Sequence, residues 1–188
     1  SDNGGLSTAE GSPTCNAPLT EGKGWMYEGG VREPLLVRWP AQVAAGSISH
    51  AVVTSPDFYP TLLEACGLPL VPEQHVDGKS FLSELQGESC DRGSVFWHFP
   101  HYANQGGTPG CSIRRGDWKL IEFFEGELEL YNLKDDLGES HNLAEAHPTL
   151  TQELLRELHA WQREVGAINP TPNADWKPWR DADLNPLD

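Results

Sequence analysis

The sequence predicts an α/β protein, and three features of its 188 residues support this fold class. Residues 35–39 form a short apolar run after a glycine-rich loop, which is typical of a buried strand in a parallel or mixed sheet. Residues 112–124 and 128–133 predict two strands of an antiparallel hairpin, with a turn at Glu125 and Gly126. Residues 148–165 predict a helix whose apolar face covers that antiparallel sheet.

We expect three regions along the chain. Residues 1–92 hold the first strand and a helix, residues 93–168 hold the antiparallel sheet with its covering helix, and residues 169–188 form a proline-rich tail. A chain of this length is able to bury a real core. The four cysteines are scattered without C-x-x-C spacing, so the sequence predicts free thiols rather than a disulfide framework or a zinc site.

The net charge of the chain is −15. Nucleic acids and anionic membranes are bound by clustered lysines and arginines, so this charge argues against both kinds of partner. An anionic substrate must instead be met by a few local cations. Apolar runs in the sequence stay well short of the roughly 20 residues that span a bilayer.

A helix is predicted over residues 55–66 in the first region. Ser55 is expected to cap it, Asp57 to interact favourably with the helix dipole from its first turn, and Gly67 to end it. Apolar residues at helical spacing predict that this helix belongs to a core: Phe58, Leu62, Leu63 and Ala65. A short strand is expected at residues 49–54, a turn at 76–80 and a short helix at 81–85.

An acid and an amide stand side by side at the start of the chain. Asp2 and Asn3 offer adjacent side-chain oxygens, which suit a hard cation such as Ca²⁺ or Mg²⁺. Lys23 lies between two glycines, which leave its ammonium group unshielded. A metal and a lysine together neutralise the charge that develops on a tetrahedral oxyanion ester. The alternatives are a simple turn at residues 2–5 and a solvated Lys23.

Aromatic residues and two histidines cluster in residues 96–102. Stacked rings and a histidine donor suit a sugar or aryl pocket. The alternative is an interior strand in which a backbone carbonyl satisfies one histidine. Both interpretations stay open for His101, and the interior strand is favoured for His98. Residues 104–110 are expected to form a pocket rim, and Arg114 and Arg115 to make surface ion pairs.

Several sequence blocks occur in an order that resembles one enzyme family. The blocks are S-D-N-G-G-L-S-T, G-K-G-W-M-Y-E-G-G-V-R-E-P-L-L-V-R-W-P, D-F-Y-P-T-L-L-E-A-C-G-L-P, V-D-G-K-S-F, F-W-H-F-P, I-R-R-G-D-W-K-L-I and E-L-Y-N-L-K-D-D-L-G-E-S-H-N-L-A. Together they are similar to the second half of the type I sulfatases, the formylglycine-dependent arylsulfatase family of the alkaline phosphatase superfamily. The resemblance implies the C-terminal part of that fold: a remnant of the main sheet and a small antiparallel subdomain packed by a C-terminal helix.

The resemblance also implies roles for individual residues. Asp2 and Asn3 would be two calcium ligands, and Lys23 would bind the sulfate ester and act in catalysis. His101 is a further candidate for substrate binding. The nucleophile of the family is a formylglycine made from the Cys or Ser of a C-x-P-S-R or S-x-P-S-R motif, and neither motif occurs in this sequence.

We therefore expect a strand and the rest of the enzyme to precede Ser1. The intact enzyme would hydrolyse sulfated carbohydrates or aryl sulfates in a periplasmic or secreted location. The chain alone is expected to be inactive, to bind Ca²⁺ weakly or not at all, and to self-associate through an exposed apolar edge. The alternatives are a phosphodiester or phosphonate hydrolase of the same superfamily and a non-catalytic binding or assembly module. The coding sequence upstream of Ser1 distinguishes them: a C-x-P-S-R motif supports the sulfatase, a Thr or Ser nucleophile supports the second, and a start codon close to Ser1 supports the third.

Overall fold

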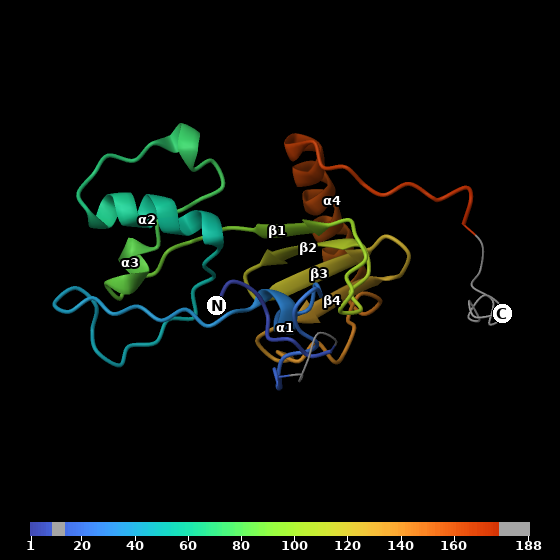
Figure 1. Ribbon diagram of the computed structural model, residues 1–188, viewed down its shortest axis with the longest axis horizontal. Helices are drawn as coiled ribbons and strands as arrows, with labels where there is room; N and C mark the ends of the chain where they lie inside the picture. The colour runs from blue at the N-terminus through green and yellow to red at the C-terminus, as the bar shows by residue number, and fades with distance from the viewer. Residues whose placement is uncertain (9–13, 177–188) are drawn as a thin grey trace, which may run out of the picture.

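A four-stranded antiparallel sheet forms the centre of the computed structural model, which describes residues 1–8 and 14–176 (Figure 1). Its strands follow one another in sequence and in space. They are β1 (Val95–Phe99), β2 (Gly110–Arg115), β3 (Trp118–Phe123) and β4 (Leu128–Asn132). The partner strand predicted at residues 128–133 and the turn at Glu125 and Gly126 are confirmed, and the first residues of the aromatic cluster lie in β1.

The prediction of one strand over residues 112–124 is wrong. This segment folds back on itself at Gly116 and Asp117, and it contributes β2 and β3 as a second hairpin. Gly116 has a φ of 61°, a left-handed conformation that glycine adopts without strain and that a tight turn requires. Ile113 consequently lies opposite Leu120 in the register.

Helix α4 (Pro148–Val165) matches the prediction and covers one face of the sheet (Figure 1). Leu154 and Leu158 are fully buried there, packed on residues of the strands. At the edge of this face, Phe96 of β1 stacks on Trp161 of α4, with ring centroids 4.8 Å apart. The alternation of side chains along each strand explains why neighbouring residues of β3, Leu120 and Ile121, belong to separate cores on the two faces.

The opposite face of the sheet is covered by the segment that leads into α1 (Glu28–Val31). Met26 packs there with Ile121, Tyr131 and Leu133 in a second, smaller core. The sheet is therefore covered on both sides by segments more than a hundred residues apart in the sequence.

A separate lobe lies beside the sheet (Figure 1). It contains the 3-10 turn Ser55–Asp57, α2 (Phe58–Ala65), a second 3-10 turn (Pro72–Gln74) and α3 (Leu82–Leu85). Thr54 rather than Ser55 caps the first turn. The buried carboxylate of Asp57 accepts the backbone N–H groups of Thr54 and Lys79 and pairs with Arg92 at 3.0 Å, so its role is structural.

Two strand predictions and one core prediction in this region are wrong. Residues 35–39 and 49–54 form no strand: all four strands of the described residues lie between 95 and 132 and pair only with each other. Leu36 is 94% exposed, and Phe58 and Leu62 of α2 are also exposed. Helix α2 instead buries Pro60 and Thr61, and the Thr61 hydroxyl accepts the backbone N–H of Phe81.

Three further expectations concern the cysteines, the tail and membranes. All four cysteines are free, as predicted. Residues 169–176 of the tail contain no helix or strand, and residues 177–188 lie outside the described part of the chain. Among the residues described, no helix is long and apolar enough to span a membrane.

Candidate functional site

The structure brings the start of the chain against the loop that carries Lys23. The backbone N–H of Lys23 donates to the carbonyl of Gly5 at 3.1 Å, and the N–H of Gly4 donates to the carbonyl of Gly30 at 3.3 Å. A β-carbon at Gly4 would lie 2.2 Å from the Gly29 carbonyl oxygen, so only glycine permits this approach. The two segments of the candidate site, about twenty residues apart, are thus held together through their backbones.

Asn16 fixes the same junction from the intervening loop. Its side-chain amide donates to the carbonyls of Gly5 at 2.7 Å and Glu21 at 2.9 Å, so one side chain ties both segments. The sequence alone did not single out this residue. The only signal was an asparagine, a residue that readily bonds to nearby backbone, among prolines.

Asp2 and Asn3 lie at the exposed end of this junction. The Asn3 amide donates to Oδ2 of Asp2 at 2.9 Å, so the two polar groups face each other. The carboxylate of Glu33 lies nearby: burial and the negative charge of Asp2 raise its pKa. Its buried Oε1 atom makes no hydrogen bond.

Oxygen donors of this kind suit Ca²⁺, which takes about six to eight oxygen ligands. Asp2 and Asn3 therefore fit calcium chemically but supply only part of a coordination sphere. The described residues contain no group of three or more His, Cys, Asp or Glu side chains placed to hold a metal.

A buried ionic network anchors the Lys23 loop to the sheet. Lys119 of β3 is 0% exposed, and its Nζ atom contacts Oε1 of Glu28 at 3.0 Å and Oε1 of Glu139 at 2.7 Å. The other oxygen of Glu139 accepts the backbone N–H of Glu28 at 2.6 Å. Since Glu28 begins α1, five residues after Lys23, this network sets where the loop sits on the sheet.

The two carboxyl groups of the network titrate differently. Burial alone would raise the pKa of Glu28, but the charges of Lys119, Arg114 and Arg32 outweigh it and hold that pKa below its ordinary value. Burial raises the pKa of Glu139, because lost hydration, together with the charge of Glu28, outweighs the opposing effect of Lys119. Sequence reasoning missed the whole network.

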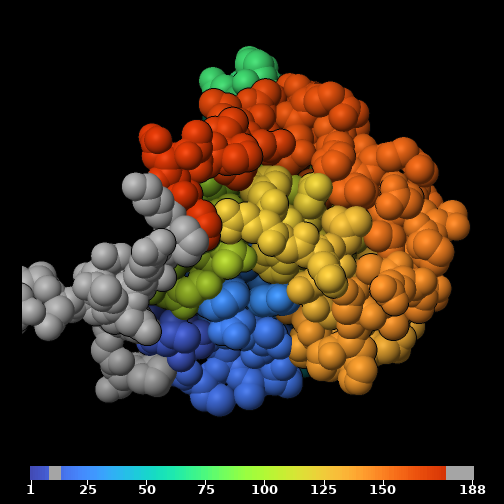
Figure 2. Space-filling view, turned by 90° about the vertical axis from the view of Figure 1, so that its right-hand side faces the viewer, coloured from blue at the N-terminus to red at the C-terminus, as the bar shows by residue number. Residues whose placement is uncertain are grey.

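A hollow of about 250 Å³ lies next to the loop that carries Lys23; it is lined by residues 24–26, Val31 and residues 97–99 of β1, and Lys23 itself is not among them. The indole N–H of Trp25 donates to the carbonyl of Gln105 at 3.1 Å, and the Thr8 hydroxyl donates to the same oxygen at 2.7 Å. Figure 2 shows the corresponding blue and light green segments side by side on the surface. The predicted aromatic strand and the Lys23 loop thus meet at one hollow.

The two histidines of the aromatic cluster differ in their surroundings. His98 contacts the carbonyl of Ile168 through Nε2 at 3.0 Å, which is the backbone satisfaction favoured from the sequence. His101 is exposed and its ring lies edge-on to Phe99, with centroids 5.5 Å apart. It is near the hollow but is not among the residues that line it.

Comparison with known proteins identifies the family. Residues 21–164 match the family model described as N-sulphoglucosamine sulphohydrolase, C-terminal. The chain belongs to this family. A sulfatase of Formosa agariphila is 41% identical over 178 residues, which cover 86% of this chain and 32% of that protein. Human arylsulfatase A is 30% identical over 184 residues, which cover 86% of this chain and 36% of that protein.

A solved structure agrees with this assignment. It is described as a protein in complex with its substrate, D-glucosamine-2-N,6-O-disulfate, and it matches with a TM-score of 0.65 and 30% identity over 78% of this chain and 31% of that one. The resemblance to the C-terminal part of sulfatases and the α/β fold class are therefore confirmed. The chain spans about a third of the length of the curated relatives it matches.

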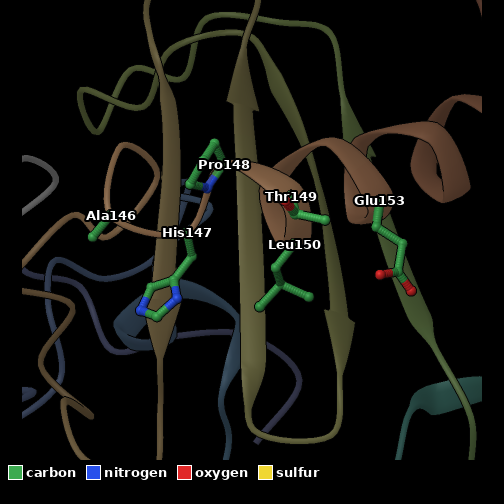
Figure 3. Close-up of a pocket in the computed structure, with 6 residues that line it drawn as sticks. All are labelled: Ala146, His147, Pro148, Thr149, Leu150 and Glu153. Atoms are coloured by element: carbon green, nitrogen blue, oxygen red, sulfur yellow. The ribbon is translucent and has the colours of Figure 1, made fainter.

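A second hollow in this sulfatase-family chain, of about 360 Å³, lies at the start of α4 (Figure 3). Residues 146–150 and Glu153 line it, and the His147 ring lies 5.2 Å from the ring of Trp118. None of the predicted site residues belongs to it.

The two arginines singled out from the sequence make different ion pairs. Arg115 pairs with Glu153 and Glu157 on α4, as predicted. Arg114 instead reaches the buried Glu28.

Proposed function

We propose that this chain is part of an enzyme that hydrolyses sulfate esters of carbohydrates, and that Lys23, Asp2 and Asn3 belong to its sulfate site. The observation that supports the proposal is the hydrogen bond from the Lys23 N–H to the carbonyl of Gly5, two residues after Asn3. Relatives support the substrate class: an N-acetylglucosamine-6-O-sulfatase of Bacteroides thetaiotaomicron is 32% identical over 157 residues, 79% of this chain and 28% of that protein.

Each residue has a distinct task in this proposal. The Lys23 ammonium holds the non-bridging oxygens of the sulfate and offsets the charge that develops on them in the transition state. The side-chain oxygens of Asp2 and Asn3 serve as two ligands of Ca²⁺, which supplies Lewis-acid polarisation of the ester when bound. His101, exposed at the rim beyond Phe99, donates a hydrogen bond to a substrate hydroxyl or sulfate oxygen.

The remaining machinery has no counterpart in these residues. Neither C-x-P-S-R nor S-x-P-S-R occurs, so the formylglycine nucleophile implied by the resemblance is not formed from this sequence. We accordingly expect no turnover of an aryl sulfate by the chain alone. We also propose that the intact enzyme is exported to a periplasm or the cell exterior. The isolated chain should self-associate through its exposed apolar side chains.

Sulfate affinity tests the role of Lys23. Inorganic sulfate is titrated into the chain at low ionic strength and followed by backbone amide chemical shifts. Lys23→Ala is expected to weaken sulfate binding about tenfold or more, since a charge-assisted contact is lost. Lys134→Ala removes an exposed lysine on another loop and serves as the matched control. Equal sulfate affinity in the two variants would remove Lys23 from the site.

A further inference from the structure

We propose that the hollow beside Lys23 holds the sugar ring of the sulfate ester, with Phe99 and Trp97 as the side chains that recognise the ring. This inference rests on the proposed function, because it takes the sulfate group to lie at Lys23. The hollow begins at Gly24, the next residue, and extends to Trp97 and Phe99 on the edge strand β1. A ring attached to a sulfate at Lys23 would therefore have this hollow next to it.

The chemistry of the wall suits a single pyranose ring. A pyranose presents an apolar C–H face with hydroxyl groups around its edge, and aromatic side chains bury such a face while the edge stays hydrated. Phe99 is 37% exposed, so its ring is accessible from solvent. The volume of about 250 Å³ is below the range of about 300–1,000 Å³ typical of ligand pockets, which favours one ring over an oligosaccharide.

The wall is held in place before any ligand arrives. Trp97 packs against the core that contains Met26 and Ile121, so its ring has a fixed support. The shared carbonyl of Gln105, which accepts from Trp25 and Thr8, ties the rim to the Lys23 loop. A preformed wall loses little side-chain freedom on binding, and this improves affinity for a small ligand.

Binding of three probes to the chain tests the inference. The probes are methyl glucosaminide 6-sulfate, the same glycoside without sulfate, and inorganic sulfate, each titrated against amide chemical shifts. Phe99→Ala is the variant, and Phe58→Ala is its matched control, because Phe58 is 40% exposed and lies on α2 in the separate lobe. We expect Phe99→Ala to weaken both glycosides about threefold to tenfold and to leave inorganic sulfate unchanged. Phe58→Ala should change none of the three.

A second variant keeps the test independent of truncation. Val31→Phe places a larger side chain at the wall of the hollow and should exclude both glycosides while sulfate still binds. Unchanged glycoside binding in both Phe99→Ala and Val31→Phe would overturn the inference. Failure of the proposed function looks different: Lys23→Ala would then bind sulfate like the unmodified chain, while the effect of Phe99→Ala on the glycosides would persist.

Discussion

Replacing Lys119 by methionine is expected to destabilise the fold strongly. Methionine has a similar length and is apolar, so the change removes the positive charge and leaves the space filled. Glu28 keeps Arg114 at 3.5 Å and Arg32 at 3.4 Å, but Glu139 keeps only the backbone N–H of Glu28. Two carboxylates that are buried at 1% exposure or less then face each other without the shared cation.

The magnitude follows from the burial of the group. Removing one member of a fully buried ionic network costs about 3–5 kcal/mol of unfolding free energy, because the partner charges stay desolvated. With a urea m-value of about 2 kcal/mol/M, the unfolding midpoint should fall by roughly 1.5–2.5 M. The loss should shrink as the pH is lowered from 7, because Glu139, whose pKa is already raised in the unmodified chain, takes up a proton more readily than an ordinary glutamate and so removes one of the two charges.

Urea unfolding followed by tryptophan fluorescence measures this change. Lys134→Met, which removes an exposed lysine, is the control and should shift the free energy by less than about 0.5 kcal/mol. The double variant Lys119→Met, Glu139→Gln removes the carboxylate left without a cation, while Glu28 keeps Arg114 and Arg32, and it should recover most of the loss. A loss below about 1 kcal/mol for Lys119→Met alone would refute the assignment of Lys119 as the shared cation of a buried network.

Three further predictions concern pH, the core and association. The fold lowers the pKa of Glu28 below its ordinary value of 4.5, so the ionised Glu28 stabilises the fold above pH 4.5 and this contribution is lost as the pH falls below it. Glu28→Gln should therefore reduce the slope of folding stability against pH in acid by up to about 1.4 kcal/mol per pH unit. An unchanged slope would contradict this prediction. Leu158→Ala opens the core under α4 and should cost about 2–5 kcal/mol in urea unfolding, whereas the exposed Val165→Ala should cost far less. Leu36→Lys combined with Leu62→Lys should lower the apparent mass in light scattering, whereas Ile168→Lys should not; a monomeric unmodified chain would contradict self-association.

Local patterns in the sequence predicted the second half of the fold well. Helix α4 spans the predicted residues, since its apolar residues repeat at helical spacing and glycine follows its last turn. The hairpin of β3 and β4 was also predicted, from two runs around a glycine turn. The Gly116 turn was missed because Arg115 and Asp117 flank it within a run that otherwise resembles one strand.

The first half was predicted less well, for a physical reason. An apolar run such as residues 35–39 has the composition of a strand, but strand formation depends on a neighbour that supplies hydrogen bonds, and composition does not specify the neighbour. The Asp2, Asn3 and Lys23 pattern was read from residue chemistry. Lys119 was not, because a lysine in a strand is ordinarily exposed, and only the fold brings Glu28 and Glu139 to it from 91 and 20 residues away.

The central claim is that Asp2, Asn3 and Lys23 act on one sulfate group. A chain labelled at asparagine side-chain amides and at lysine Nζ allows both ends of the site to be followed in a single titration with inorganic sulfate. We predict that the Asn3 amide and the Lys23 ammonium signals shift together with one dissociation constant, and that Lys23→Ala abolishes the shift at Asn3. A shift at Lys23 with no response at Asn3, at any sulfate concentration, would contradict the claim.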